Sequence, residues 1–424
     1  MIQYAFMGIG FLVTLLNVLT FLALRRRVLT AFPKRGGLIA WLLAVPFFIM
    51  LHAGILLMFG GITGLMVVRS EVPEWFAIAG MSFQMGVWLY GGWLLLVGTP
   101  AALISAVRRY RRLFVKKPEG TEPEKELAID ERRRNLVKAG LVLPVAMVAT
   151  TAGGAMAARQ EPSITRLRLA VPRDRTNLHG LTIAQVSDVH VGSYMDGARL
   201  DMIRDTMNAL KVDIHVCTGD LLDNHPDQLE ESTRFLRGLQ PRVGRFMCMG
   251  NHEYISGREG GMDEILAGLR DTGVQLLIDD AQKIQIGGDH LWMLGIDYPG
   301  EGGSHSVYNR MTERTTDESL DVALAQTRDD GAPRILLSHH PKTFHQASER
   351  PIDLTLSGHT HGGQLSLGRI GDFELTPVLP FEFFHNGHYA RNGGRLYVNA
   401  GAGGWMPVRI NCPPEITVIE LVSA

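Results

Sequence analysis

The distribution of hydrophobic residues divides the chain into two parts of different character. In the first part, residues 1–115, long apolar stretches alternate with short charged ones: Tyr4–Leu24, Leu38–Val68 and Trp75–Val107. Each stretch reaches or exceeds the length that crosses the hydrocarbon core of a bilayer, about 20 residues. The pattern predicts about three transmembrane helices. Buried core helices of a soluble protein are the alternative, but such helices rarely run past about 20 apolar residues without a charge.

Basic residues follow the first and the third apolar stretch. They are concentrated in Arg25–Arg35 and Arg108–Lys117, whereas the loop after the second stretch carries Arg69, Glu71 and Glu74. Loops rich in Lys and Arg stay on the cytoplasmic side of a membrane. We therefore expect the first loop to be cytoplasmic and the third helix to return the chain to the cytoplasm.

Residues 116–160 are expected to connect the two parts. They comprise a polar, acidic linker, Pro118–Glu131, and a fourth apolar segment, Ala139–Ala158, which is rich in Gly and Ala. The run Arg132–Lys138 before this segment resembles a twin-arginine export signal. Ala155-Met156-Ala157 also has the small-x-small form of a signal-peptidase site. If the segment crosses outward, the rest of the chain is extracytoplasmic in a multi-pass protein of the cell membrane; the alternative is a helix on the inner leaflet.

From Ile164 to the end, the pattern changes to short apolar runs with β-sheet composition, alternating with helical periodicity. Leu200, Ile203, Met207 and Leu210 have the spacing of one face of an amphipathic helix. Strands that alternate with helices are typical of α/β folds. We therefore predict an α/β domain over residues 164–424.

Five of the apolar runs lead directly into Asp, Asn or His. The runs are Leu181–Val186, Ile214–Cys217, Phe246–Met249, Ile335–Leu337 and Leu354–Leu356. They continue as Ser187-Asp188-Val189-His190, Gly219-Asp220-Leu221-Leu222-Asp223, Gly250-Asn251-His252-Glu253, Ser338-His339-His340-Pro341 and Gly358-His359-Thr360-His361. Ligands of open α/β sheets bind at the carboxyl ends of the strands, so these five ends are expected to meet at one site.

Net charge and cysteine content argue against nucleic-acid binding, a disulfide framework and a cysteine zinc site. The net charge is −1, which gives no basic excess for the backbone of a nucleic acid, so no nucleic-acid partner is expected. Cys217, Cys248 and Cys412 are too few and too scattered for a disulfide framework or a CxxC zinc site. Cys217 and Cys248 lie in apolar runs and are expected to be buried as small hydrophobic residues.

Together, the motifs DxH, GDxxD, GNHE, a histidine near proline, and GHTH resemble the calcineurin-like metallophosphoesterase superfamily, over about Leu181 to Pro414. The stretches Leu396–Gly401 and Pro407–Arg409 are similar to the membrane-associated bacterial branch. The resemblance implies a calcineurin-like α/β sandwich after an N-terminal transmembrane helical region. It also implies a binuclear metal centre that activates water for the hydrolysis of phosphate esters.

Carried over motif by motif, the resemblance places seven metal ligands: Asp188, His190 and His361 on one ion, Asn251, His339 and His359 on the other, and Asp220 between them. Oxygen and imidazole ligands without thiolate suit Mn, Fe or Zn. His252 is expected to stabilise the transition state or protonate the leaving oxygen. His339 fits the His-x-Pro spacing better than His340, which is the alternative ligand. Asp223 and Glu253 are expected to support the site without binding metal.

The expected enzyme is a metal-dependent hydrolase of phosphodiesters, pyrophosphates or phosphomonoesters, with phosphodiesters as the first expectation. Attachment to a membrane suggests a lipid or another envelope component as substrate. The alternative is a non-catalytic metal-binding sensor attached to a membrane domain. The aromatic segment Pro380–His388 could shape a substrate pocket or meet a membrane, but packing of its own rings is the simpler interpretation.

Overall fold

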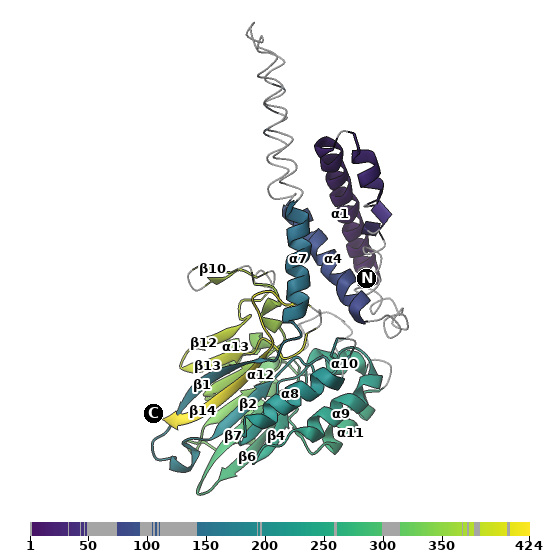
Figure 1. Cartoon of the computed structure of the whole chain (residues 1–424). Helices are drawn as coiled ribbons and strands as arrows, with labels where there is room; N and C mark the ends of the chain where they lie inside the picture. Colours follow the sequence, from purple (N-terminus) through teal and green to yellow (C-terminus); the bar gives the residue numbers. More distant parts are fainter. Residues whose placement is uncertain are drawn as a thin grey trace. The chain divides into compact units, whose positions relative to one another are not determined.

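The computed structural model describes residues 2–48 except 33, 43 and 46, residues 74–93, residues 104, 107 and 110, and residues 142–424 except 193, 196, 258–260, 299–313, 367, 371–372, 377–381 and 405–407. The chain divides into two compact units, Met1–Ala155 and Met156–Ala424 (Figure 1).

The first unit contains three long helices: α1 (Ile2–Ala31), α4 (Glu74–Trp93) and α7 (Val142–Ala157), whose last residues reach the unit boundary. A buried amide pair joins α1 to α4, because Gln84 Nε2 donates a hydrogen bond to Asn17 Oδ1 at 3.0 Å. The Thr151 hydroxyl of α7 donates to the carbonyl of Ser82 at 2.6 Å. These bonds satisfy polar groups between largely apolar helices, as buried polar groups require.

The predicted transmembrane helices are not confirmed. Within the part of the chain that the structure describes, no helix meets the length and apolarity that crossing a membrane requires. Much of Leu38–Val68 and part of Trp75–Val107 lie outside the described residues, as do the whole acidic linker and the twin-arginine-like run. The fourth apolar segment, Ala139–Ala158, contains helix α7.

The second unit is built on two six-stranded sheets. The first has the order β1 (Ser163–Val171), β14 (Glu415–Ser423), β2 (Thr182–Val186), β3 (Ile214–Cys217), β4 (Gly244–Met247) and β5 (Gln275–Leu276). The second has the order β12 (Gly387–Arg391), β13 (Gly394–Val398), β9 (Leu354–Ser357), β8 (Arg334–Leu337), β7 (Asp289–Gly295) and β6 (Asp280–Ile286). A short ribbon pairs β10 (Arg369–Ile370) with β11 (Phe373–Glu374).

Helices flank the sheets (Figure 1). They are α8 (Gly197–Ala209), α9 (Leu229–Gly238), α10 (Asn251–Ser256), α11 (Met262–Asp271), α12 (Thr316–Ala325) and α13 (Phe344–Ala347). Leu200, Ile203 and Met207 of α8 are buried, at the spacing that predicted this helix. Leu210 lies just beyond its last residue and packs against the same core.

Alternation along the strands explains the layers. Ile183 of β2 belongs to the core between the two sheets, together with Ile335 and Leu337 of β8. The neighbouring Ala184 instead packs with the helices on the outer face, because successive side chains of a strand point to opposite faces. The unit is therefore a sandwich of helices, two sheets and helices, which confirms the predicted α/β fold.

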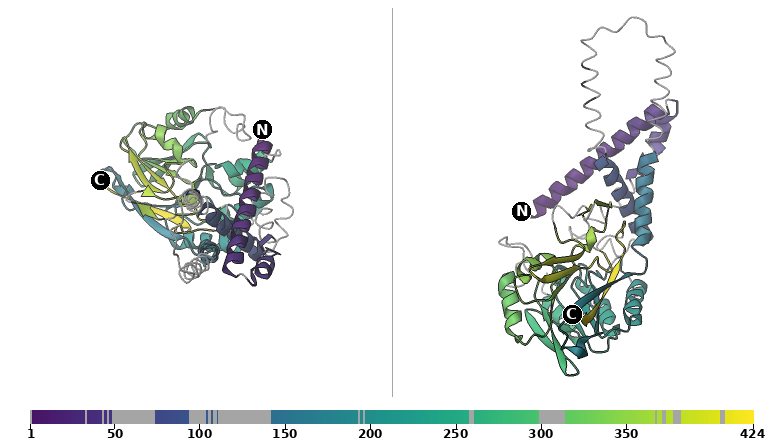
Figure 2. Two further views of the ribbon diagram at one scale, coloured as in Figure 1. Left: turned by 90° about the horizontal axis from the view of Figure 1, so that it is seen from above. Right: turned by 90° about the vertical axis from the view of Figure 1, so that its left-hand side faces the viewer.

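The direction of the strands places the polar residues that follow them at the carboxyl ends of neighbouring strands. The neighbours β2, β3 and β4 are parallel, and so are β7, β8 and β9. β14 pairs antiparallel with β2 and parallel with β1, so that Ser163 aligns with Glu415 from the far end of the chain (Figures 1 and 2). The three cysteines form no disulfide. Cys217, Cys248 and Cys412 are free and buried, as expected for the first two.

Candidate metal centre

The turns after the strands aim the polar side chains. Asp188, His190, Asp220, His359 and His361 all have positive φ, between 50° and 70°. Residues other than glycine rarely adopt this left-handed conformation, and such residues concentrate at functional sites. Five of the seven predicted ligands therefore occupy backbone positions that only a firmly fixed loop maintains.

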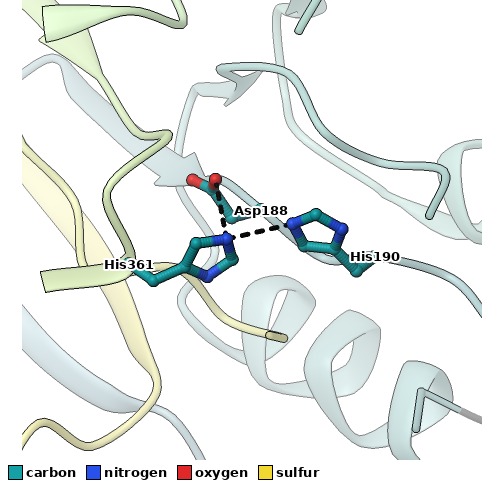
Figure 3. Close-up of side chains that lie close together, drawn as sticks. All are labelled: Asp188, His190 and His361. Carbon is teal, nitrogen blue, oxygen red and sulfur yellow. Dashed lines mark hydrogen bonds and ion pairs between the residues drawn. The ribbon is translucent and has the colours of Figure 1, made fainter. Parts of the chain in front are cut away.

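The first cluster contains Asp188, His190 and His361, all at most 2% exposed (Figure 3). The two Nε2 atoms of His190 and His361 are 3.0 Å apart. His361 Nε2 lies 3.4 Å from Asp188 Oδ1. Strands β2 and β9, which belong to different sheets, precede these residues, so the site forms where the two sheets meet.

The second cluster lies on the other side of Asp220. Asp220 Oδ2 is 3.1 Å from His339 Nε2, and His359 Nδ1 is 3.3 Å from the same His339 atom. The Oδ1 atom of Asn251 is 3.1 Å from His359 Nδ1. Asp220 Oδ2 is also 3.7 Å from His190 Nε2, so this carboxylate faces both clusters.

The donor atoms of both clusters fit metal cations. His190 Nδ1 donates to Asp223 Oδ1 at 3.3 Å, and His339 Nδ1 donates to the carbonyl of Thr218 at 2.7 Å. In a neutral imidazole the other ring nitrogen then carries a lone pair. The Nε2 lone pairs thus point toward neighbouring nitrogens and carboxylate oxygens, an arrangement that a bound cation stabilises. The set of oxygen and imidazole ligands matches what Mn, Fe and Zn bind.

Burial and neighbouring charge have opposite effects on the pKa of His339. Burial disfavours the protonated form of His339, but the adjacent Asp220 carboxylate outweighs it and raises the pKa of His339 to about 9. Burial holds the pKa of His361 well below its ordinary value, with the neighbouring His190 acting in the same direction. Despite burial, the carboxylates of the site also raise the pKa of His190, so nearby negative charge favours a positive charge at the imidazoles of His190 and His339.

Glu253 supports the loop that carries Asp220. Its carboxylate is fully buried and accepts four backbone N–H groups. They belong to Gly250 (2.7 Å), Asp220 (3.0 Å), Leu221 (2.6 Å) and Leu222 (3.2 Å). The side chain is therefore saturated by main-chain donors, in line with the supporting role expected for it.

Two glycines let the loops approach the carboxylates. A Cβ at Gly250 would lie 2.2 Å from Asp220 Oδ1, and a Cβ at Gly358 would lie 2.1 Å from Asp188 Oδ2. No side chain fits at these distances, so the glycines of the GNHE and GHTH motifs are required by packing.

His252 borders both clusters without belonging to the set of seven. Its backbone N–H donates to Asp220 Oδ1 at 2.9 Å, its Nδ1 bonds to the carbonyl of Asp223, and its ring meets that of His190 edge-on at 4.4 Å between centroids. The His252 side chain is 17% exposed, and burial lowers its pKa. Asp223 thus does more than shape its loop, because it contacts both His190 and His252.

Two further histidines, His340 and His215, are buried but are not among the seven proposed ligands. His340 Nδ1 accepts the N–H of Lys342 at 3.2 Å, while the ring lies 4.5 Å from that of His359. Of the two neighbours, His339 is thus the one whose ring nitrogen faces Asp220. His215 is 1% exposed within β3. In the described part of the aromatic segment, the Phe384 ring meets that of Phe383 edge-on at 5.4 Å between centroids and that of Phe344 outside the segment at 5.6 Å.

A sixth strand end was overlooked in the sequence. The apolar run of β7 continues through Ile296 to Asp297 and Tyr298, which follow the same rule as the other five. The Tyr298 ring lies 5.9 Å from that of His339 and 6.0 Å from that of His359. The buried Asp297 carboxylate accepts the hydroxyl of Tyr254, which ties β7 to α10.

Comparison with known proteins agrees with this geometry. The family model described as "Calcineurin-like phosphoesterase" matches residues 181–363. An uncharacterized metallophosphoesterase of Aquifex aeolicus (strain VF5) is 31% identical over 242 residues, which are 57% of this chain and 85% of that protein. This chain therefore belongs to the calcineurin-like phosphoesterase family, as the motifs predicted.

Two further relatives carry more specific names. A "Transmembrane protein with metallophosphoesterase domain" of Danio rerio is 30% identical over 285 residues, 64% of this chain and 60% of the relative. The "UDP-2,3-diacylglucosamine pyrophosphatase LpxG" of Chlamydia trachomatis is 28% identical over 292 residues, 61% of this chain and 88% of the relative. The match spans about 60% of the length of the first of these relatives.

Proposed function

We propose that this chain hydrolyses a phosphate ester or pyrophosphate with water activated at a binuclear metal centre. Asp188, His190 and His361 hold one ion, Asn251, His339 and His359 hold the other, and Asp220 bridges them. The observation that carries this proposal is the position of Asp220 Oδ2, 3.1 Å from His339 Nε2 and 3.7 Å from His190 Nε2. A bridging carboxylate needs this placement between two ligand sets.

When bound, two metal ions would activate a water molecule and neutralise the charge that develops on the phosphoryl oxygens. The chain supplies the positioning. Asp188 accepts the backbone N–H of His359 at 2.9 Å, which links the ligand loops of the two sheets. The hydrogen bonds at Nδ1 of His190 and His339 fix the ring orientations, so that both Nε2 lone pairs remain available.

His252 is proposed as the residue that contacts the substrate. Its Nδ1 is occupied by the Asp223 carbonyl, so Nε2 is the ring atom left to interact with a phosphoryl or leaving oxygen. A ring protonated at Nε2 can donate to the leaving oxygen.

The proposed substrate is a lipid or other envelope component carrying a phosphodiester or pyrophosphate bond. The similarity to a protein named as a diacylglucosamine pyrophosphatase supports this class. The apolar stretches of the first 115 residues, and the relative named as a transmembrane protein, support attachment of the chain to a membrane. We further propose that residues 164–424 act on the extracytoplasmic side, following the export-like run at residues 132–138. Degradation of this domain by protease added to intact spheroplasts would agree; full protection would contradict it.

The alternative, a non-catalytic metal sensor, is not favoured. A site that had lost catalysis would be expected to lack one or more of its parts. Here all seven candidate ligands lie in the two clusters, and His252 lies against them at 4.4 Å from the ring of His190.

The test is metal-dependent hydrolysis by the purified full-length chain. Substrates are an aryl phosphodiester, an aryl phosphomonoester and a nucleotide-linked diacyl sugar with a pyrophosphate bond, each with Mn²⁺, Fe²⁺ or Zn²⁺. Asp220→Asn removes the bridging charge, and Asp205→Asn, an exposed carboxylate on α8, is the matched control. We expect turnover in wild type and the control, and none in Asp220→Asn. Two bound ions without turnover on any substrate would favour the sensor.

A further inference from the structure

Arg409 is a buried cation whose described partners include no carboxylate. The side chain is 1% exposed. Its three nitrogens donate to main-chain carbonyls, those of Ala400 (2.8 Å), Gly401 (3.0 Å), Gly403 (2.7 and 3.2 Å), Cys412 (3.1 Å) and Pro413 (3.4 Å). Burying an arginine is costly unless its donors are satisfied. The described acceptors of this one all lie on either side of it in sequence, in two short stretches, residues 400–404 and 408–413.

Residues 400–404 and 408–413 are hydrogen-bonded to the loops of the first cluster. The N–H of Ala402 donates to the carbonyl of Ser187 at 2.9 Å, and the N–H of Gly403 donates to the carbonyl of Asp188 at 3.1 Å. On the other side, Cys412 Sγ donates to the carbonyl of His361 at 3.3 Å. The two stretches therefore bond to the main chain of two proposed ligands that come from different sheets.

Packing at Gly401 brings the guanidinium close to those ligands. Gly401 has φ +79°, and a Cβ built there would lie 3.0 Å from Asp188 Cβ, 3.2 Å from His361 Nδ1 and 3.3 Å from Arg409 Nη2. The guanidinium of Arg409 and the imidazole of His361 therefore both pack closely against Gly401. The N–H of Ala400 is held from the opposite side by Glu415 Oε2 at 2.9 Å.

The second cluster has different supports. Glu253 binds the loop of Asp220, and the Thr218 carbonyl orients His339. Among the hydrogen bonds of the described residues, none joins Arg409 to the loops that carry Asp220, Asn251 or His339. The effect of Arg409 should therefore fall first on the first cluster, and reach the second through His359, whose N–H Asp188 accepts.

We propose that Arg409 is a positioning residue for the first metal site: it ties residues 400–404 to residues 408–413 in a support that holds Asp188 and His361 in ligating geometry. The proposal rests on the binuclear centre proposed above. Its consequence is unequal, because loss of the guanidinium should weaken the site of Asp188, His190 and His361 more than the other site. A lysine retains the charge but not the planar fork that reaches several carbonyls at once.

The test compares Mn²⁺ binding by full-length wild type, Arg409→Met, Arg409→Lys and Arg334→Met. Arg334 is a matched control, since it is 7% exposed and also donates to carbonyls, those of Arg328 and Pro351. It lies at the start of β8, whereas His339 follows the end of that strand. Calorimetry gives stoichiometry and affinity, and electron paramagnetic resonance separates a coupled Mn²⁺ pair from a single ion.

We expect two ions in wild type and in Arg334→Met. In Arg409→Met, one affinity should fall at least tenfold and the coupled signal should be replaced by that of a single ion, as in His361→Asn. Arg409→Lys, which serves as the test if Arg409→Met does not fold, should lose affinity at the same site several-fold. Unchanged affinities in both variants, or equal weakening of both sites, would overturn the role of Arg409. Fewer than two ions in wild type would overturn the binuclear centre, and this inference with it.

Discussion

Replacement of Glu253 by glutamine tests whether one buried carboxylate holds the bridging loop together. Its Oε1 accepts the N–H groups of Leu221 and Leu222, and its Oε2 accepts those of Asp220 and Gly250. Glutamine has a single acceptor oxygen, so its amide NH₂ must face two of these N–H groups whichever way the side chain turns.

The expected loss of stability follows from the number of N–H groups that lose their acceptor. A buried donor that loses its acceptor costs about 1–3 kcal/mol, so two such groups predict a loss of about 2–6 kcal/mol in the free energy of unfolding. That is a large share of the roughly 5–15 kcal/mol that stabilises an ordinary domain. Burial raises the pKa of Glu253, and the N–H groups of Gly250 and Leu222 oppose that rise by favouring the carboxylate.

Hydrogen exchange followed by mass spectrometry measures this loss within the second unit alone, in peptides covering β2 to β4. Glu349→Gln, an exposed position, is the control and should change stability by about 0.5 kcal/mol or less. The variant should also bind metal more weakly, because the loop of Asp220 loses its support. A loss below about 1 kcal/mol with unchanged metal binding would refute the reasoning.

Three further changes separate catalysis, orientation and stability. His252→Ala should lower turnover about 10²–10⁴-fold with two ions still bound, measured by steady-state rates and metal analysis; loss of metal as well would make His252 a ligand or a structural residue. Asp223→Ala should weaken metal binding about 10–100-fold because it removes the acceptor of the His190 Nδ1 hydrogen bond, and calorimetry with unchanged affinity would exclude that role. Burial lowers the pKa of His215 from 6.5 to about 4. Because only the unfolded chain takes up this proton between those pH values, wild type should lose about 3 kcal/mol relative to His215→Gln as pH falls from 6.5 to 4, and parallel stability curves would contradict this.

The strand ends were predictable from sequence because their signal is local. An apolar run followed by Asp, Asn or His needs only strand periodicity and the rule that parallel strands present their carboxyl ends together. The same rule applies to β7 and Asp297, which shows that the rule was sound and its application incomplete. The family resemblance supplied the ligand assignment that spacing alone left open.

The supports of the site were not predictable in the same way. A supporting role was expected for Glu253, but its partners, like those of Arg409, are main-chain N–H or carbonyl groups, which every residue possesses and which no side-chain pattern reveals. The pairing of Ser163 with Glu415 joins residues that are far apart in the sequence, so no local pattern predicts it. In the first unit, apolar length predicted membrane spans that the described helices do not confirm.

The most direct test of the binuclear centre is anomalous diffraction from crystals of the full-length chain grown with Mn²⁺. The account predicts two peaks about 3.5–4 Å apart, with Asp220 between them, one beside His190 and His361 and the other beside His339 and His359. A single peak, or two peaks that do not share Asp220, would contradict it.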